Sequence, residues 1–459
     1  MAMTAPKTVA IIGSAIAGPT LALQILSHPI LRRTFTPILF DSSPSPSETN
    51  SRAGATVGLF ANGLYPLRRL GLESSIRSQG HECGALTTWS CGYDGGSERL
   101  NSQGDAMWSG DLETGVVYFE RWALQKLLVE RVGELGGEVN WGKKATDFSS
   151  LDNGKLSIAF EDGSNVTADL LIGADGGFSS VRKFILNQRN NDTAETRWLP
   201  DFMDLTGIYG VSSAEKATSS TAPFSDSHLI YLDKGFLATG PCPDGKTRWD
   251  LILPENSPPS SSSIDSKSTT SASDAESWQS FIVPNQYPLN STVEILRQHR
   301  NVMHPYAGTL EALLTSADRI IRTPLRQRVW KQDEIQWGNT ALIGDAARLM
   351  LPTSGQGTGF AIEDATVLAR SLLRHATSNT IGGMRTALEE YARLREPRSK
   401  KMAILAALAA SWSTSTSWFW KGVRYYGSKW QPDRPEARRQ TGKDPWPFNE
   451  RIDIDDSTR

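Results

Sequence analysis

The sequence predicts an α/β protein in which a Rossmann-like domain of the glutathione-reductase type is interleaved with an α+β domain built on a mostly antiparallel sheet. Residues 8–12 form a β-branched run that ends at a glycine, and residues 19–26 follow with a helical pattern, as in a βαβ unit. Residues 197–327 contain several short strand patterns separated by turns. A buried strand at residues 340–343 and a helix over residues 357–373 return the chain to the first domain.

Composition narrows the classes of function. The chain of 459 residues is long enough for two or three lobes around a large core. Because 48 Lys and Arg residues nearly balance 50 Asp and Glu residues, the net charge of -2 gives no field for a polyanion, and no nucleic acid is expected as a partner. Cys83, Cys91 and Cys242 lack the spacing of a metal site or a disulfide framework, which favours a reducing, cytoplasmic location. We expect no metal site.

The first glycine motif follows the first strand. Gly13 permits a tight turn, and Gly18 lets the next helix approach the strand, so that backbone N–H groups can meet a pyrophosphate. Ala15 occupies the place of the usual middle glycine, and an ordinary strand–turn–helix explains the motif alone equally well. Asp41, at the end of the second strand, adds weight because a carboxylate there can accept hydrogen bonds from an adenosine ribose.

A second motif places Asp175 and Gly176 after a buried strand, with Arg182 in the helix that follows. A capped helix start would by itself explain Asp175. Arg121 is expected near the N-terminus of another helix, after an extended segment.

The third motif is the strongest local signal in the chain. Asp345 follows the late buried strand, and Pro352, Gly355, Gly357 and Thr358 then lead into a helix. Three glycines within five residues at a helix N-terminus provide a group of N–H donors for an electron-rich ligand. A structural turn rarely needs so many glycines beside a proline.

In this order and at these separations, the three motifs resemble those of the class A flavoprotein monooxygenases with the para-hydroxybenzoate hydroxylase fold. The resemblance covers residues 8–190 and 338–400. It implies an enzyme that binds FAD, takes electrons from a transient NADPH or NADH, and transfers one oxygen atom of O2 to a small organic substrate. Two departures stand out: Ala15, and Arg348 at a position where many relatives have histidine.

The resemblance also implies roles for individual residues. Asp41 would bind the adenosine ribose, Arg121 the pyrophosphate or ribityl chain, and Asp345 a ribityl hydroxyl. The start of the late helix would face the pyrimidine edge of the flavin, where negative charge collects on reduction. The expected FAD-binding residues are Gly13, Ala15, Gly18, Asp41, Arg52, Gly54, Arg121, Asp175, Gly176, Asp345, Pro352, Gly355, Gly357 and Thr358.

The expected domains are discontinuous. The FAD-binding domain comprises residues 1–75, 111–190 and 338–400. The substrate-binding domain comprises residues 76–110 and 191–337, with a disordered Ser-rich loop at 256–273. Residues 401–459 form a C-terminal helix and tail. We expect the Trp- and Tyr-rich stretch 412–430 to pack on the enzyme, with contact to a membrane surface as the less favoured alternative.

The substrate is expected to be aromatic or similar to a polyketide or alkaloid, as in secondary metabolism. Tyr209 and Tyr231 lie on predicted strands and are our candidate catalytic residues, although a buried strand tyrosine more often serves packing. His228, Arg248 and Trp249 are further candidates.

Several alternatives remain open. The sequence from Trp249 to Pro254 lacks the first tryptophan of the WxWxIP motif, which argues against a halogenase. Hydroxylation, epoxidation and Baeyer–Villiger oxidation use the same oxygenated flavin and cannot be separated here. A dehydrogenase on the same fold, or a non-catalytic nucleotide-binding protein, would also carry these motifs.

Overall fold

The computed structural model describes most of the chain. The described residues are 5–45, 56–83, 85–91, 97–104, 115–189, 197–213, 226–259, 276–305, 307–375, 381–431 and 452–455. Most of the predicted disordered loop, from residue 260 onward, lies outside them. Among the described residues, no helix is both long and apolar enough to cross a membrane.

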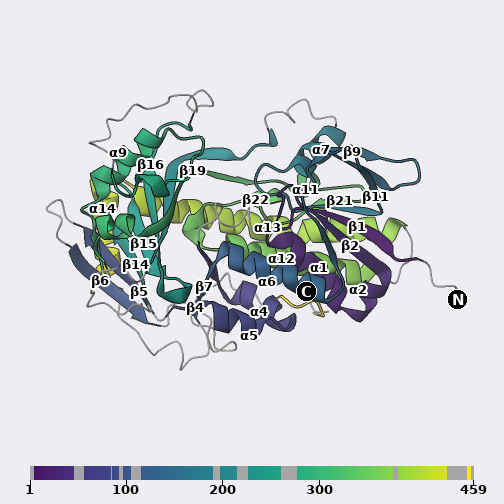
Figure 1. The fold of residues 1–459 in the computed structure, drawn as a ribbon, viewed down its shortest axis with the longest axis horizontal. Coiled ribbons are helices and arrows are strands. Elements are labelled where there is room, and N and C mark those ends of the chain that lie inside the picture. The colour runs from purple at the N-terminus through teal and green to yellow at the C-terminus, as the bar shows by residue number, and fades with distance from the viewer. Residues whose placement is uncertain are drawn as a thin grey trace.

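One lobe is built on a six-stranded sheet with the strand order β20-β21-β12-β1-β2-β8 (Figure 1). All neighbouring pairs are parallel except β20 with β21. The strands are β1 (Lys7–Ile12), β2 (Phe35–Phe40), β8 (Glu138–Asn140), β12 (Leu170–Gly173), β20 (Gln336–Trp337) and β21 (Thr340–Leu342). Since β12 and β21 are fully buried apolar strands, they fit the interior of a sheet covered on both faces.

Two layers cover this sheet. On one face, α12 (Gly357–His375) packs against α1 (Ala17–Ser27), α4 (Ala61–Arg69) and α13 (Ile381–Thr414). On the other lies the meander of β9 (Ala145–Ser150), β10 (Leu156–Phe160) and β11 (Asn165–Ala168), whose Phe160 ring lies 4.9 Å from that of Phe40. Parallel strands between two layers are the expected Rossmann-like arrangement.

The second lobe is an eight-stranded, mostly antiparallel sheet with the order β22-β19-β13-β16-β15-β14-β5-β6. Its strands are β5 (Ala85–Cys91), β6 (Ser97–Gly104), β13 (Asp201–Ser212), β14 (Ser227–Tyr231), β15 (Phe236–Pro241), β16 (Thr247–Pro254), β19 (Ala317–Val329) and β22 (Arg348–Leu349). One face packs on α9 (Leu289–His299) and α10 (Leu310–Thr315) through Ile208, Trp249 and Leu251. Side chains of alternate residues therefore project from the opposite face.

The remaining helices and strands complete the described fold. They are α2 (Pro29–Thr34), β3 (Thr56–Leu59), α5 (Glu73–Gln79), β4 (His81–Glu82), β7 (Val117–Glu120), α6 (Arg121–Glu134), α7 (Ser180–Gln188), β17 (Met303–His304), β18 (Gly308–Thr309) and α11 (Gln332–Ile335). The predicted fold class is confirmed.

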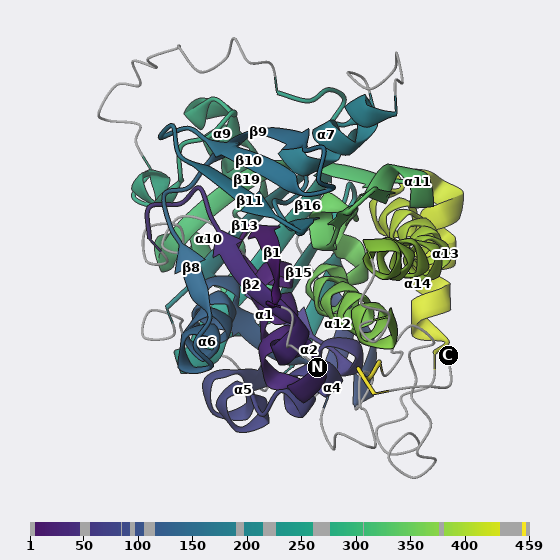
Figure 2. The ribbon, with the colours of Figure 1, turned by 90° about the vertical axis from the view of Figure 1, so that its right-hand side faces the viewer.

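The C-terminal helices extend from one lobe to the other (Figure 1), and Figure 2 shows them along one side of the molecule. The 34-residue α13 begins at Ile381, well before residue 401, where the C-terminal helix was expected to start, and it includes Pro397. After it, α14 (Trp418–Lys429) packs on the second lobe through the buried Arg424 and Ser428. Its side chains at Trp418 and Trp430 are 85% and 78% exposed.

A buried charge cluster fastens α12 to its neighbours. Asp364 of α12 accepts a hydrogen bond from the Gly344 amide at 2.8 Å and forms ion pairs with Arg348 and, at 2.6 Å, Arg395 of α13. Arg348 Nε also donates to Ser399 Oγ at 2.7 Å. Burial alone would raise the pKa of Asp364, but the two arginines outweigh it and hold that pKa below its usual value. The carboxylate is therefore charged at neutral pH.

We expect Arg348→Met to lower the free energy of unfolding by about 3 to 5 kcal/mol, because it leaves a buried carboxylate with one partner fewer. The control is Arg385→Met on α13, where an exposed ion pair with Glu389 should contribute less than about 1 kcal/mol. Urea denaturation followed by circular dichroism measures both. Equal losses in the two variants would contradict the role of the cluster.

A buried histidine also makes stability depend on pH. His304 Nδ1 accepts from the Ala307 amide at 3.1 Å, so the ring proton is on Nε2, which donates to Thr239 Oγ1 at 2.8 Å. Burial, assisted by the nearby His228, lowers the pKa of His304 to about 3. The folded protein then binds fewer protons than the unfolded chain below pH 6.5.

We therefore expect the free energy of unfolding to fall as pH decreases from 6.5 toward 3, by up to about 1.4 kcal/mol per pH unit from His304. The variant His304→Gln should show a shallower slope between pH 6 and 4.5 in urea titrations at fixed ionic strength. An unchanged slope would show that His304 is not responsible.

Candidate functional site

The first glycine turn forms at the carboxyl end of β1. Gly13 has a φ of +106°, and a Cβ there would lie 2.3 Å from the carbonyl oxygen of Ala174, after the neighbouring β12. At Gly18, a Cβ would lie 2.1 Å from the Gly13 carbonyl oxygen. Both glycines are thus required for the turn and for the approach of α1 to the sheet.

The start of α1 suits an anion. Its N-cap residue, Ile16, provides no side-chain hydrogen bond, and the first turn contains no acidic residue. The first N–H groups of a helix lack intrahelical partners, so those of α1 can bind a pyrophosphate. Ala15 lies in the turn just before this helix and is half-buried. Its methyl group is therefore compatible with the turn.

Asp41, directly after β2, supports the same turn. Its Oδ2 accepts a hydrogen bond from the Ser14 amide at 2.7 Å, and its Oδ1 accepts one from the Ser43 amide at 2.9 Å. Gln125 of α6 adds a hydrogen bond to the Ser14 carbonyl at 2.8 Å. Each Asp41 oxygen keeps further acceptor capacity for a ribose hydroxyl. The sequence analysis did not identify Gln125, whose role depends on where α6 packs.

Arg121 and Asp345 approach the same edge from different segments. Arg121 is the first residue of α6, and Asp345 lies in the 3-10 turn Gly344–Ala346 after β21. The Asp345 side chain is exposed to solvent, yet enough protein surrounds its carboxyl that burial raises its pKa, against the opposing charges of Arg121 and Arg348. Such a carboxyl can bond a polar ligand group that covers it.

The N-terminus of α12 is open. Pro352 belongs to the 3-10 turn Pro352–Ser354, and Gly355 follows in the left-handed conformation with a φ of +62°. Gly355 and Gly357 are exposed, Thr358 is half-buried, and a Cβ on Gly357 would meet nothing within 4 Å. The first amides of this 19-residue helix therefore stand beside open space. A flat, electron-rich ring edge fits there.

Side chains behind this loop were not predicted. Asn62 of α4 donates to Gln356 Oε1 at 2.9 Å and to Glu363 Oε1 at 2.7 Å, and Glu363 in turn pairs with Arg398 at 2.5 Å. A Cβ on Gly359 would lie 2.7 Å from the Asn62 amide. Glu363 and Asp364 are adjacent acids within the predicted helix. This pair was the sequence signal that could have indicated the network.

The second motif makes structural contacts, and FAD binding by Asp175 and Gly176 stays a prediction. Asp175 Oδ2 accepts hydrogen bonds from the Ser180 amide at 2.7 Å and the Val181 amide at 3.2 Å, and so it caps α7. Arg182 is fully buried, donates to the Ala346 carbonyl at 2.8 Å and stacks 3.6 Å from the centre of the Trp330 ring. Gly176 has a φ of +83° in the turn between them. The predicted FAD-binding residues Arg52 and Gly54 lie outside the described residues.

Tyr209 lies on the sheet face that α9 and α10 do not cover. It is paired with Asp250 across β13 and β16, and Arg248, two residues along, bonds Asp250 at 2.5 Å. Tyr209 packs on the cluster that contains Leu351, the residue before the open loop. Burial raises the pKa of Tyr209 strongly, and the Asp250 charge adds to this rise. The phenol is therefore a hydrogen-bond donor at neutral pH.

The sequence analysis did not identify Asp250, and it named Arg248 only as a further candidate. Burial raises the pKa of Asp250 in spite of the opposing charge of Arg248. Arg248 also stacks on Tyr118 at 4.3 Å, and its buried Nε has no acceptor among the described residues. This face therefore offers a phenol, a carboxyl and an arginine side by side.

The other candidates lie elsewhere. Tyr231 is on the same face, but its ring is covered by Arg424 of α14 at 4.7 Å. His228 and Trp249 project from the opposite face, where His228 Nδ1 accepts from Trp89 at 2.9 Å and Trp249 donates to Ser212 Oγ at 3.1 Å. Burial lowers the pKa of His228 to about 4. Both side chains therefore contribute to packing on the sheet face that α9 and α10 cover.

Comparison with known proteins identifies the fold and the family. The family model described as "FAD binding domain" matches residues 7–219 and 287–406. The FAD-dependent monooxygenase janM of Penicillium janthinellum is 25% identical over 401 residues, which cover 85% of this chain and 74% of the relative. The 6-methylsalicylate 1-monooxygenase atA of Aspergillus terreus is 26% identical over 416 residues, covering 86% and 80%.

Among solved structures, HpxO of Klebsiella pneumoniae in complex with FAD and uric acid superposes with a TM-score of 0.69 at 18% identity, covering 92% of both chains. The open helix starts, the glycine turn and the carboxylates fit FAD along the edge of the parallel sheet. This chain therefore belongs to the FAD-binding family of the class A flavoprotein monooxygenases.

Proposed function

We propose that this FAD-dependent monooxygenase inserts one oxygen atom into an electron-rich aromatic or polyketide- or alkaloid-like small molecule of secondary metabolism, with NADPH or NADH as electron donor. The arrangement that supports the proposal is the sheet face of Tyr209, Asp250 and Arg248, which meets the open start of α12 through the Leu351 cluster. The three cysteines, none of which forms a disulfide, agree with a cytoplasmic location.

FAD would extend along the carboxyl edge of the parallel sheet. The α1 amides and Arg121 would bind the pyrophosphate, Asp41 the adenosine ribose, and Asp345 a ribityl hydroxyl. The α12 amides from Gly357 onward would bond the pyrimidine edge of the flavin, where the helix dipole favours negative charge. When bound, FAD would take electrons from NAD(P)H and activate O2, the source of the transferred oxygen atom.

The protein's own residues would orient and activate the substrate. The Tyr209 hydroxyl, kept protonated by its raised pKa, would donate a hydrogen bond to a phenol or carbonyl oxygen. Asp250 would accept the phenolic proton at its carboxylate, which increases electron density on the ring. Arg248 would hold Asp250 in place through their 2.5 Å contact. Such an acceptor favours hydroxylation of a phenol over epoxidation or Baeyer–Villiger oxidation.

The proposal is tested by product analysis. The purified protein should show flavin absorbance, oxidise NAD(P)H faster with a substrate from a panel of phenols, indoles and polyketides, and transfer one ¹⁸O atom from ¹⁸O2 to the product. Flavin reduction without ¹⁸O in any product would indicate a dehydrogenase, and absence of flavin binding would indicate a non-catalytic protein.

A change at Gly18 should abolish FAD binding. We expect Gly18→Ala to purify with less than about a tenth of the wild-type flavin content, because its Cβ would meet the Gly13 carbonyl oxygen at 2.1 Å and open the turn. Gly133→Ala in α6 is the matched control, since nothing lies within 4 Å of its Cβ. Absorbance of the released flavin gives the content. Equal content in both variants would contradict the assigned position of FAD.

The role of Tyr209 has its own test. We expect Tyr209→Phe to keep its FAD but to form at least about tenfold less product per NAD(P)H oxidised, because the substrate loses an orienting hydrogen bond. Tyr426→Phe, which removes an exposed hydroxyl on α14, is the control. Oxygen uptake, peroxide release and product are measured together. Wild-type coupling in Tyr209→Phe would rule out the role.

A further inference from the structure

A cavity lies at the far end of the antiparallel sheet, away from the candidate FAD site. It is lined by the ends of β5 and β14, the turn that leads into β15, the end of α9, and α14. Figure 1 shows these elements at the opposite end of the molecule from β1 and α1. None of the residues assigned above to FAD lines it. Tyr231, one of the two candidate catalytic residues from the sequence, is part of its wall.

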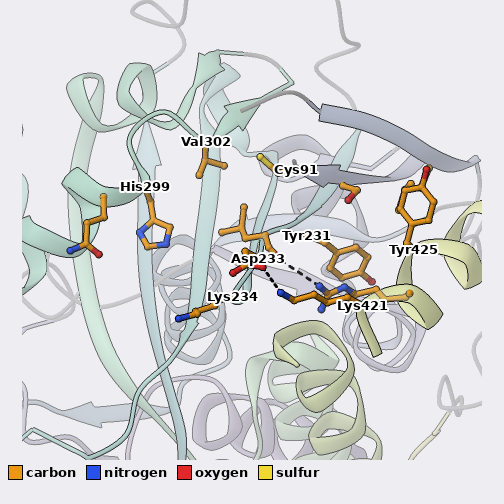
Figure 3. A pocket seen from close by; sticks show the side chains of 14 residues that line it. Cys91, Tyr231, Asp233, Lys234, His299, Val302, Lys421 and Tyr425 are labelled. Carbon is orange, nitrogen blue, oxygen red and sulfur yellow. Dashed lines mark hydrogen bonds and ion pairs between the residues drawn. The ribbon is translucent and has the colours of Figure 1, made fainter. Parts of the chain in front are cut away.

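The size and walls of the cavity suit a small organic molecule. Its volume is about 680 Å³, within the range of roughly 300 to 1,000 Å³ for ligand sites. In Figure 3, His299 and Val302 lie on one side and Tyr231 and Tyr425 on the other. Leu100 and Leu232 complete the apolar part. Two aromatic rings and three aliphatic side chains can therefore cover a ring system.

The charges in the cavity favour an anion. Three cationic side chains, Lys234, Lys421 and Arg424, line it beside one carboxylate, that of Asp233, which leaves a local charge of +2. Lys421 pairs with Asp233, and Arg424 is held by the Ser413 carbonyl at 2.9 Å. Lys234 is exposed and has no carboxylate partner within the described ranges. It is therefore available to a ligand.

The cavity is separated from the catalytic face by packed side chains. Tyr231 and Leu100 belong to the apolar cluster that also contains Leu351, Ala406 and Ala410. The ring of Tyr231 lies between Arg424 and this cluster. A molecule in the cavity would therefore contact Tyr231 and Leu100 of this cluster but not Tyr209, which does not line the cavity.

From these observations we propose that the cavity is a second small-molecule site. It binds a molecule with apolar aromatic rings and one anionic group, such as an aryl carboxylate or sulfonate. The rings would pack between Val302 and the two tyrosines, and the anionic group would pair with Lys234. The proposal concerns binding only. It stands whether or not the assigned substrate class is correct.

The test uses the FAD-loaded enzyme and two probes that differ by one charge. One is 8-anilino-1-naphthalenesulfonate, and the other is N-phenyl-1-naphthylamine, which lacks the sulfonate. Isothermal titration and fluorescence should show one saturable site that prefers the sulfonate. Lys234→Glu should weaken sulfonate binding about tenfold, which is about 1.4 kcal/mol, and leave the neutral probe nearly unaffected. Lys126→Glu, on the exposed side of α6, is the matched control.

A second variant fills the cavity. Val302→Trp should abolish binding of both probes, whereas Ile404→Trp, at a site on α13 that is 61% exposed, should not. Flavin content and basal NAD(P)H oxidation should stay at wild-type values in all four variants. Wild-type binding in both Lys234→Glu and Val302→Trp would overturn the proposed site. Equal weakening of the two probes by Lys234→Glu would overturn the anion preference.

The thiol of Cys91 provides an independent readout, because it also lines the cavity. The sulfonate probe should slow alkylation of Cys91 by N-ethylmaleimide, measured by peptide mass spectrometry, with Cys83 as the internal reference outside the cavity. Alkylation of Cys91 at the same rate with and without saturating probe would contradict binding there.

Discussion

The carboxylate of Asp364 is the interaction on which the arrangement of the FAD-binding lobe depends. It binds the Gly344 amide after β21, Arg348 before the open loop, and Arg395 of α13. Three segments far apart in the sequence are thus attached to one buried charge. A buried charge is costly in free energy unless its partners remain in place. The cluster therefore restrains the segment from Gly344 to Arg348 relative to α12 and α13.

The two lobes are joined by a second buried carboxylate. Glu120, at the end of β7, accepts from Lys246 at 3.4 Å and from Arg319 at 3.3 Å, and both of these belong to the antiparallel-sheet lobe. The next residue, Arg121, begins α6 and approaches Asp345. The same backbone segment therefore connects the antiparallel sheet to the start of α6 and to Asp345. These ion pairs restrain the position of one lobe relative to the other.

The two faces of the antiparallel sheet differ in character because its side chains alternate between them. Tyr209 and Asp250 project from one face, and Ile208, Trp249 and Leu251 from the other. The far end of the sheet, covered by α14, contains the cavity that Tyr231 and Lys234 line. One sheet thus supports two different surfaces. Near its centre, the phenol of Tyr209 lies beside the carboxyl of Asp250, and at its end a cavity is lined by apolar and cationic side chains.

The sequence by itself determined the features that depend on local backbone geometry. Gly13 and Gly355 adopt positive φ values that other residues rarely take, and Asp41 follows a strand, so their positions could be read from motif and spacing. The fold class and the FAD family followed from the same signals. Tertiary structure decided which side chains share a face. Strand register placed Asp250 beside Tyr209, and it placed His228 on the reverse side. Helix packing brought α14 over Tyr231 and Arg395 to Asp364, because contacts between distant segments leave no periodic trace in the sequence.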